Sequence, residues 1–422
     1  MSDDRRVDQS RRRLLQTGGA ALVLGGLASR ATGAAAAPTS QQNAIKLPKL
    51  LAPTEHEGEP PPESLPPGKR VGFAIVGLGH LALEQILPAF GQSRRCRPVA
   101  LVSGDRNKAM AVASQHGIDA KHIYDYKTYD RLRDDPDIDV VYIVLPNGLH
   151  AEYTVRAFQA GKHVLCEKPM ANSVAECQQM IDAGEQAGKK LMIAYRLQYE
   201  PHNREAIRLA RSGALGALKG FMASNGQAQG DVNQWRLNRK LAGGGALVDV
   251  GIYCLNAARY LSGEEPSQVA AFVHSTPRDP RFREVEEQVD FLMRFPSGFQ
   301  ASCTTSYGFH GSKRFRLMGE SAWVELDPAF PYEGLQLRIG HKSTSGEGEE
   351  IEQRVLAPRN HFAAEMDHLA ICIQAGKRPR TPGEEGMQDM RIITAIYRAA
   401  RSGRPIDLPV VTKPDAFRGD TA

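Results

Sequence analysis

Several features that mark special classes of protein are scarce in this sequence. Aromatic residues make up 7% and charged residues 24% of the 422 residues, a composition of ordinary globular proteins rather than fibrous or disordered ones. No cysteines form a C-x-x-C pair and no histidines have a ligand spacing such as H-E-x-x-H, so we expect no metal site. Their dispersal favours buried free thiols for all six cysteines, Cys96, Cys166, Cys177, Cys254, Cys303 and Cys372.

The charge balance gives no sign of a nucleic-acid partner. The formal net charge is +5, but residues 1–37 carry six Arg and three Asp and so account for +3 of it. The remaining +2 is spread over the rest of the chain and predicts no basic surface of the kind that nucleic acid requires. At a typical domain size of about 100–200 residues, the length predicts two domains with appendages.

Residues 1–37 have the pattern of an export signal. Ser10-Arg11-Arg12-Arg13 precedes a short Gly/Ala/Leu-rich run over 17–28, and the small residues over 31–37 suit cleavage. A membrane anchor is the alternative, but this run is shorter than the ~20 residues needed to cross a bilayer, and we expect no later run to be long enough. The pattern resembles a twin-arginine signal, whose route exports folded proteins. We therefore expect the twin-arginine machinery as a partner, a location in the periplasm and no stable membrane anchor.

Residues 38–70 form a segment rich in Pro, Glu and Ala that ends in Pro60-Pro61-Pro62-Glu63-Ser64-Leu65-Pro66-Pro67. Such a composition does not build a core and prefers extended geometry. Two interpretations remain open. The segment is either a tether left after cleavage or an arm that lies over a neighbouring subunit.

A nucleotide-binding domain is predicted over residues 71–195. The apolar run Val71–Val76 is typical of a strand buried on both faces, and Gly77-Leu78-Gly79-His80-Leu81-Ala82 and a helical stretch follow it. Gly77 permits the tight turn, Gly79 lets the backbone approach a pyrophosphate, and Ala82 lets helix and strand pack closely. This context favours dinucleotide binding over a simple glycine-rich turn.

The end of the second predicted strand, 97–102, favours NADP over NAD. Ser103 stands where an NAD enzyme would place a carboxylate on the ribose, and Arg106 and Lys108 follow. A hydroxyl and two cations can bind a 2′-phosphate that a carboxylate would repel. Asp105 is the opposing residue, because the preference reverses if its side chain faces the ribose.

The rest of the chain completes an α/β domain and an α+β domain. Further strands are predicted at 139–145, 162–166 and 190–196, with ligands expected beyond their carboxyl ends. Over 196–422, alternating segments such as 288–295 and 299–304 predict a largely antiparallel open β-sheet. We expect substrate binding and oligomerisation in this domain. Helices are predicted around 201–212, from the glycines at 243–245 through 260, at 362–375 and at 387–400.

Three residues could perform acid–base chemistry. Asp249 and Tyr253 are four apart near a helix start and so project from one face, and Lys168 follows a strand end. Taken singly, such a Tyr is more often a packed aromatic and such a Lys a surface cation. Only their combination with a nicotinamide site favours catalysis.

These motifs carry a family resemblance. Gly77-Leu78-Gly79, Cys166-Glu167-Lys168-Pro169 and Gly243-Gly244-Gly245 followed by Asp249-Val250-Gly251-Ile252-Tyr253 resemble the family of glucose–fructose oxidoreductase, inositol dehydrogenase and rhizopine-catabolism proteins. Most members have His where this chain has Tyr253, a departure that the glucose–fructose oxidoreductase branch shares. The likeness to that branch extends to Gly383–Asp389, and Ser103 and Lys108 match its NADP-binding positions.

The resemblance implies a coupled reaction in a homo-oligomer of two or four chains. Glucose would be oxidised to glucono-lactone and fructose reduced to sorbitol through one tightly bound NADP. The implied cofactor contacts are Gly77, Leu78, Gly79, His80, Ala82, Ser103, Arg106, Lys108, Tyr126, Leu145, Asn147, His150, Glu167, Lys168, Arg196, Trp235 and Arg236. The implied catalytic residues are Lys168, Asp249 and Tyr253, and the implied sugar contacts are these three with Arg196 and Tyr199.

In this mechanism Tyr253 takes the proton from the sugar hydroxyl and later returns it. A free phenol titrates near pH 10, which leaves a deficit of about 4 kcal/mol at neutral pH. An ammonium about 4 Å away supplies roughly that much, so Lys168 is expected to stabilise the phenolate, with Asp249 orienting a sugar hydroxyl or the Lys168–Tyr253 pair.

Four alternatives stay open from the sequence. The chain could be an aldose–aldose oxidoreductase, a plain aldose dehydrogenase, a sugar-binding protein without catalysis, or a glycoside hydrolase that uses a nicotinamide cofactor. Fold and hydride chemistry do not fix the substrate.

Overall fold

The computed structural model describes Leu47, residues 65–343 and residues 345–420. The predicted export signal and most of the predicted arm lie outside these residues. At the end of the arm, the backbone N–H of Leu65 donates to the carbonyl of Arg94 at 2.9 Å, and the turn η1 (Pro67–Lys69) leads into the first strand.

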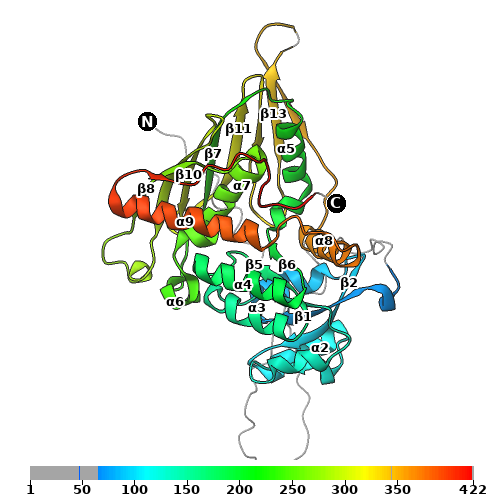
Figure 1. Ribbon diagram of the computed structural model, residues 1–422. Coiled ribbons are helices and arrows are strands. Elements are labelled where there is room, and N and C mark those ends of the chain that lie inside the picture. Colours follow the sequence, from blue (N-terminus) through cyan, green and yellow to red (C-terminus); the bar gives the residue numbers. More distant parts are fainter. Residues whose placement is uncertain (1–46, 48–64, 344, 421–422) are drawn as a thin grey trace, which may run out of the picture. The chain divides into compact units, whose positions relative to one another are not determined.

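The first half forms a six-stranded parallel sheet in the order β3-β2-β1-β4-β5-β6 (Figure 1). This is the Rossmann order, as predicted. The bounds are β1 (Val71–Val76), β2 (Cys96–Val102), β3 (Ile123–Tyr124), β4 (Val140–Ile143), β5 (His163–Glu167) and β6 (Leu191–Ala194). Only β3, which has two residues, had no apolar run to predict it.

Helices cover both faces of this sheet, which is why its strands are continuous apolar runs. Residues of α3 and α4 share one core cluster with alternate residues of β1, and residues of α8 share the other. The helical elements are η2 (Ala82–Ile86), α1 (Leu87–Ala89), α2 (Arg106–His116), η3 (Ala120–His122), η4 (Tyr129–Asp134), η5 (Asn147–Leu149), α3 (His150–Gln159), α4 (Val174–Ala187) and η6 (Arg196–Tyr199).

The second half forms a nine-stranded sheet in the order β14-β13-β12-β11-β7-β10-β9-β8-β15. All its pairs are antiparallel except the parallel pair of β7 and β10, so the predicted open, mostly antiparallel sheet is confirmed. The strands are β7 (Leu218–Gln227), β8 (Gln268–His274), β9 (Gln288–Arg294), β10 (Gln300–Ser306), β11 (Gly311–Gly319), β12 (Ala322–Leu326), β13 (Leu337–Lys342), β14 (Glu349–Arg354) and β15 (Ile406–Asp407).

One face of this sheet contacts helices, and the other, the open face, carries exposed apolar side chains among the described residues. Figure 1 shows α5, α7 and α9 along the covered face. On the open face Met222, Phe272 and Leu292 are 59%, 79% and 56% exposed. The remaining elements are α5 (Pro201–Arg211), η7 (Trp235–Leu237), α6 (Arg239–Ala242), η8 (Leu247–Gly251), α7 (Ile252–Ser262), η9 (Pro280–Phe282), α8 (His361–Gln374) and α9 (Gly383–Ser402).

One sequence expectation needs correction. Within the described ranges, the helical stretch Arg239–Ser262 is long and apolar enough to cross a membrane, with a mean hydropathy of 1.3, although we expected no such run after the export signal. Its apolar window is 78% buried inside the protein, because η8 and α7 form the central helix of the second half. The cysteines behave as expected, and all six are buried free thiols.

Candidate functional site

The glycine turn after β1 leaves room for a ligand against the backbone. Gly77 has φ +93°, and a Cβ there would lie 2.4 Å from the carbonyl oxygen of Val144, so only glycine fits. A Cβ on Gly79 would meet no atom of the described residues within 4 Å. Gly79 also lines the neighbouring cavity. The protein therefore offers open backbone where a pyrophosphate would have to approach.

A cavity of about 770 Å³ lies where the strand ends of the first sheet meet the second half. This size suits a cofactor or small-molecule site. It brings together predicted residues from both halves of the chain. These are Gly77, Leu78, Gly79, His80, Tyr126, Leu145, Asn147, Glu167, Lys168, Arg196, Trp235, Arg236, Asp249 and Tyr253.

The predicted 2′-phosphate residues lie outside the lining of this cavity, beyond the end of β2. Ser103 is buried, and its hydroxyl accepts the backbone N–H of Asp105 at 3.1 Å. The carboxylate of Asp105 accepts the backbone N–H of Lys108 at 3.0 Å and caps α2. Arg106 is exposed, and Tyr126, which lines the cavity, packs beside Gly104 in the same turn. Because its carboxylate caps α2, Asp105 has a structural role that does not involve the ribose of a cofactor.

Two other predicted residues, Ala82 and His150, are buried away from the cavity lining. Ala82 is fully buried in the packing between helix and strand, as its small size allows. His150 is fully buried, and its ring lies between the carbonyls of Leu145 and Pro169, so it joins the two loops that carry the site. Burial lowers the pKa of His150.

Tyr199 does not reach the cavity. Its hydroxyl lies 3.1 Å from the Thr381 hydroxyl, and its ring packs on His368. It is 4% exposed and turned toward α8. We therefore leave it out of the sugar contacts.

Lys168 and Arg196 both lie against Tyr253. The Lys168 ammonium is 4.5 Å from the centroid of the Tyr253 ring, and the Arg196 guanidinium carbon is 5.2 Å from it. Two cations therefore lie over the ring of one phenol at cation–π distance.

Asp249 holds this arrangement in place. Its main-chain carbonyl accepts a hydrogen bond from Lys168 Nζ at 2.7 Å, and its carboxylate lies 3.6 Å from the same atom. The carboxylate also accepts bonds from Arg236 Nε at 3.1 Å and from the Tyr307 hydroxyl at 2.9 Å. Burial would raise the pKa of Asp249, but Arg236, Lys168 and the Tyr307 hydrogen bond outweigh it, so the net shift is downward. Asp249 stays charged and orients the ammonium.

Asp249 lies on the π-helical turn η8, and Tyr253 lies on α7 directly after it. The predicted spacing of four residues is thus spread over two helix types, and both side chains still line the cavity. π-Helical turns occur often at functional sites.

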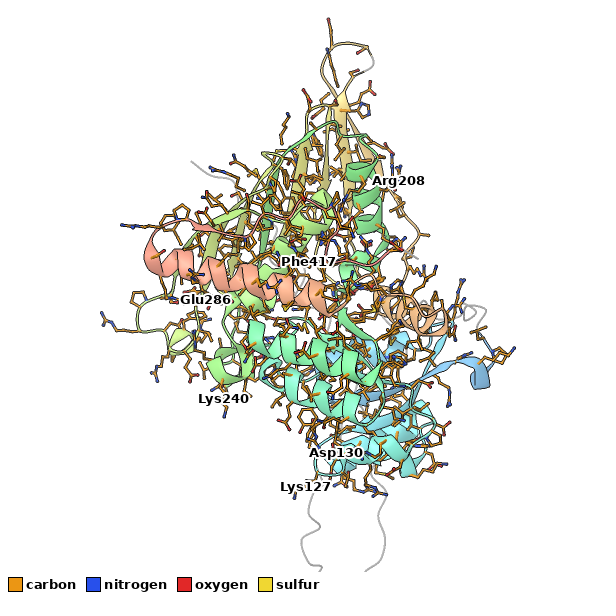
Figure 2. The ribbon with its side chains drawn as sticks, in the orientation of Figure 1. Lys127, Asp130, Arg208, Lys240, Glu286 and Phe417 are labelled. Carbon is orange, nitrogen blue, oxygen red and sulfur yellow. The ribbon has the colours of Figure 1, made fainter. Side chains whose placement is uncertain are left out.

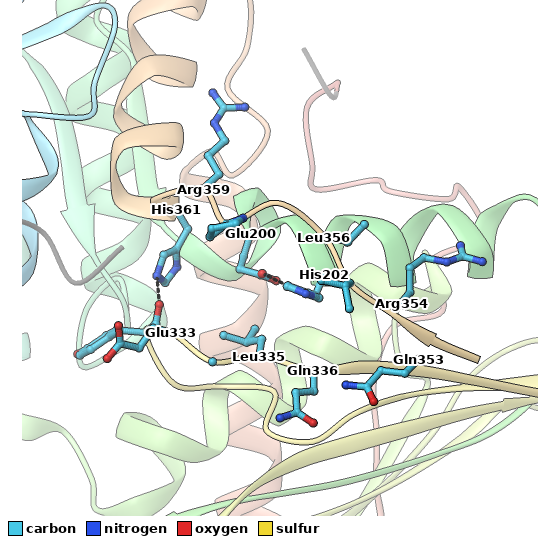
Figure 3. A pocket seen from close by; sticks show the side chains of 14 residues that line it. Glu200, His202, Glu333, Leu335, Gln336, Gln353, Arg354, Leu356, Arg359 and His361 are labelled. Atoms are coloured by element: carbon cyan, nitrogen blue, oxygen red, sulfur yellow. Dashed lines mark hydrogen bonds and ion pairs between the residues drawn. The ribbon is translucent and has the colours of Figure 1, made fainter. Parts of the chain in front are cut away.

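Arg196 connects the site to a loop of the second half. Its guanidinium donates to the carbonyls of Phe330 at 2.7 Å and Pro331 at 3.2 Å, and it lies 3.2 Å from His361 Nδ1. A pocket of about 280 Å³ lies beside this loop, and Figure 3 shows His361 in its wall. His361 Nε2 bonds the Tyr332 carbonyl at 3.0 Å. Arg196 therefore positions the loop that forms one wall of the site.

A pair of buried carboxyl groups lies beneath the site. The Tyr142 hydroxyl contacts Glu167 at 2.9 Å and Glu365 at 3.2 Å, and burial raises the pKa of both carboxyls. The Tyr142 hydroxyl therefore links the two carboxyls in one buried hydrogen-bond cluster, and Glu167 brings this cluster to the cavity wall.

Sequence analysis named Trp235, Arg236, Asp249 and Tyr253 in the second half but missed the other residues of the wall around them. Most of the missed residues come from strand ends and loops with no motif, although Val250 lies within the motif of η8 and Phe362 lies on α8. The missed residues are Asn225, Gln227, Asp231, Asn233, Gln234, Val250, Lys313, Phe330, Pro331, Tyr332 and Phe362.

One group of possible metal ligands occurs among the described residues, His122, Asp135 and Asp137. His122 Nδ1 already lies 2.5 Å from the Asp135 carboxylate, and the Tyr124 hydroxyl bonds that carboxylate at 2.9 Å. These contacts account for the cluster as a set of hydrogen bonds.

Two family profiles match the chain. Residues 71–195 match the oxidoreductase family with an NAD-binding Rossmann fold, and residues 203–325 match the C-terminal domain of the GFO/IDH/MocA proteins. The chain belongs to the GFO/IDH/MocA oxidoreductase family. The resemblance read from the motifs is thereby confirmed at the level of the family, and with it a nicotinamide-cofactor fold.

Several known proteins are similar over most of the chain. A solved aldose–aldose oxidoreductase from Caulobacter crescentus is 48% identical with a TM-score of 0.77, over 80% of this chain and 100% of that one. The D-xylose 1-dehydrogenase [NADP(+)] of Haloarcula marismortui is 33% identical over 80% of this chain and 93% of its own length. The 1,5-anhydro-D-fructose reductase of Ensifer adhaerens is 28% identical over 80% and 98%.

Proposed function

We propose that this protein oxidises an aldose at C1 and passes the hydride, through one retained NADP, to a second sugar. The observation that carries the proposal is the cavity in which Lys168 and Arg196 flank Tyr253 beside the glycine turn. Similarity at 48% identity to an aldose–aldose oxidoreductase supports a second aldose as the acceptor. Fructose, the acceptor implied by the motif resemblance, is the competing candidate, favoured by Tyr253 where most of the family has His.

The cofactor, when bound, supplies the nicotinamide ring that accepts and returns the hydride. Tyr253 takes the proton of the C1 hydroxyl as the carbonyl forms, and returns a proton to the alkoxide of the acceptor. Lys168 stabilises the phenolate and the negative charge on the sugar oxygen. Asp249 fixes Lys168, and Arg236 and Tyr307 in turn fix the Asp249 carboxylate.

NADP is the proposed cofactor. Ser103, Arg106 and Lys108 offer a hydroxyl and two cations at the end of β2, and the Asp105 carboxylate is engaged in capping α2. The NADP(+) specificity of the D-xylose 1-dehydrogenase relative is consistent with this choice. An affinity for NAD equal to that for NADP, measured on protein stripped of cofactor, would contradict it.

The proposed setting is the periplasm, reached by the twin-arginine route in folded form. No pool of soluble NADP is expected there, so the enzyme benefits if one molecule is reduced and reoxidised in place. We also propose a dimer or tetramer, since the open sheet face exposes Met222, Phe272 and Leu292. Fractionation of cells that express the full chain, and light scattering of the purified protein, test these two points.

One assay tests the function. Purified protein is incubated without added cofactor, with glucose alone, with glucose plus xylose, and with glucose plus fructose, and the products are separated and quantified. Gluconate with an equal amount of xylitol or glucose-derived sorbitol indicates an aldose acceptor. Sorbitol formed from isotope-labelled fructose indicates the ketose acceptor.

The remaining outcomes separate the other classes. Turnover only with a continuous supply of NADP indicates a plain aldose dehydrogenase. Release of free sugar from a glycoside indicates a hydrolase, and sugar binding without any product indicates a binding protein. Each of these outcomes would overturn the proposed two-sugar cycle.

A further inference from the structure

A second, larger cavity of about 1010 Å³ lies apart from the lining of the proposed catalytic site. Its walls come from α5, the end of η6, residues 356–359, Arg380 and the C-terminal segment 413–420. Figure 2 labels Arg208 on α5 and Phe417 on the C-terminal segment, the two elements on either side of it. None of the residues predicted for cofactor or catalysis lines this cavity.

The cavity is strongly basic. Seven Arg or Lys side chains line it against three Asp or Glu, an excess of four positive charges. The acidic groups are largely used, because Glu205 already pairs with Arg208 and Arg354, and Asp415 with Arg211 and Arg418. Within the described ranges, four of the lining cations have no carboxylate partner, namely Arg204, Arg359, Arg380 and Lys413.

Arg380 is the group that points to a ligand. It is only 5% exposed, and no protein atom in the described part of the chain accepts a hydrogen bond from its Nε. Its backbone is fixed, since its N–H donates to His368 Nε2 at 2.9 Å and its carbonyl accepts from Gly419 at 3.0 Å. A buried guanidinium without a counter-charge is unfavourable.

Other buried arginines of the same protein are paired with carboxylates, as buried charges usually are. Arg259 is fully buried and bonds Glu265, Glu385 and Asp389, and the side chain of Arg418 bonds Glu385 and Asp415. Arg380 has no such carboxylate within the described residues. An anion from solution, entering the cavity that Arg380 lines, would supply the missing charge.

We propose that this cavity binds a phosphate-bearing small molecule, with the phosphate on Arg380 and with Arg204 and Arg359 completing the site from the rim. Arginine matches phosphate oxygens with paired N–H donors, and an excess of four charges suits a dianion better than a single carboxylate. The buried base and the concave walls suit a small molecule rather than a flat acidic surface.

The basic cavity and the catalytic cavity are linked by shared structural elements. Gln198 and Tyr199 line the basic cavity, and Arg196 lies on the same turn, η6, and lines the catalytic one. Arg359 lies two residues before His361, which contacts Arg196. We therefore expect phosphate occupancy to change the KM for sugar, an effect that rests on the proposed function, whereas the binding itself does not.

Calorimetric titration tests the binding on the protein with its cofactor in place, so that the nucleotide site is filled. The probes are inorganic phosphate, pyrophosphate, glucose 6-phosphate and a glutamate-rich peptide, each at one fixed ionic strength. We expect saturable binding that Arg380→Gln weakens at least about tenfold. The double variant Arg204→Gln/Arg359→Gln changes only exposed rim residues and should weaken binding without disturbing the fold. Arg401→Gln, an exposed residue of α9, is the matched control.

Thermal unfolding gives a second readout. Phosphate should raise the Tm of the parent and of Arg401→Gln, and should raise it less in Arg380→Gln. Without phosphate, Arg380→Gln should be no less stable than the parent, because it removes an unpaired buried charge.

Three results would overturn the proposal. They are no binding of any probe at millimolar concentration, binding that Arg380→Gln and the double variant leave unchanged, and binding of a glutamate-rich peptide but of no phosphate. Strong binding of glucose 6-phosphate with weak binding of inorganic phosphate would identify a sugar phosphate as the source of the group. The reverse order would identify the free anion.

Discussion

Two groups of charged side chains in this protein contain the same kinds of residue, but one group lines a cavity and the other is buried. Lys168, Arg236 and Asp249 face the catalytic cavity, whereas Arg259 is enclosed with Glu265, Glu385 and Asp389. Arg418, at the edge of the basic cavity, joins this network through Glu385. In the cavity, two cations share one carboxylate, and Arg196 adds a third positive charge. In the enclosed network, three carboxyls face two guanidiniums, and burial raises the pKa of Asp389.

This difference follows from what each group has to do. An enclosed charge must be matched inside the protein, because water cannot reach it. The enclosed network joins α7, α9 and the C-terminal segment, and the Tyr195 hydroxyl at the end of β6 donates to Asp389 at 2.7 Å. A group at a cavity can keep unmatched positive charge for a ligand or a developing negative charge.

Removing the phenol hydroxyl of Tyr253 should have the largest effect on the cavity side of this comparison. We expect Tyr253→Phe to lose kcat by roughly a thousandfold, because the proton acceptor is gone, while the cofactor stays bound. Steady-state kinetics and the absorbance of the bound cofactor measure the two quantities. Tyr260→Phe is the matched control, since its hydroxyl bonds Asn203 away from the cavity. Near-normal turnover of Tyr253→Phe would disprove its role.

Removing the central cation should have the largest effect on the enclosed side. Arg259→Met leaves Glu265, Glu385 and Asp389 without their shared partner, so we expect the free energy of unfolding to fall by about 3–5 kcal/mol. Urea unfolding measures this loss. The kcat of the folded variant, assayed in the cold, should stay close to that of the parent. A variant that kept its stability would show that the network is not a structural tie.

His368, beside the basic cavity, is a buried group that stays neutral near pH 7 instead of pairing with an opposite charge. Burial, with Arg380 and Arg204 nearby, lowers its pKa from 6.5 to about 4. Between these values the folded protein binds fewer protons here than the unfolded chain, so the free energy of unfolding falls as pH is lowered. The loss should reach up to about 3 kcal/mol. Urea unfolding at a series of pH values should show a smaller loss for His368→Gln, and an unchanged one for the exposed control His310→Gln. Equal loss in both variants would count against this assignment.

The predicted 2′-phosphate residues at the end of β2 should show the smallest effect. Ser103→Glu places a carboxylate where we propose that the 2′-phosphate binds, so NADP affinity should fall about tenfold while NAD affinity changes less. Lys108→Ala should give a smaller loss, and the exposed Lys127→Ala none. Fluorescence titration of cofactor-free protein measures all three. A loss for NAD as large as that for NADP would place the phosphate elsewhere.

The first sheet and its glycine turn could be predicted because their signals are local. Val71–Val76 is an apolar run with both faces buried, and the tight turn at Gly77 needs a residue that tolerates φ +93°. The cluster of Lys168, Asp249 and Tyr253 was reached from motif spacing and resemblance together. The wall formed by Asn225, Lys313 and Tyr332 had no such signal, since strands paired across the nine-stranded sheet bring it to the site.

Tyr199 shows where proximity in sequence misleads. It lies three residues after Arg196 on the same short turn, yet its hydroxyl contacts Thr381, a residue far along the chain. The partner decides which cavity such a side chain faces. The unmatched charge of Arg380 was equally invisible, because nothing local distinguishes it from the well-paired Arg259.

The sequence by itself determined the parallel nucleotide-binding sheet, the glycine turn and the family, because backbone conformation, periodic burial and short motifs depend on neighbouring residues. Only the tertiary structure decided which cations are matched and which face a cavity. Electrostatic pairing depends on distances between residues that lie up to 204 positions apart in the chain, as Arg211 and Asp415 do, and no local pattern encodes those distances.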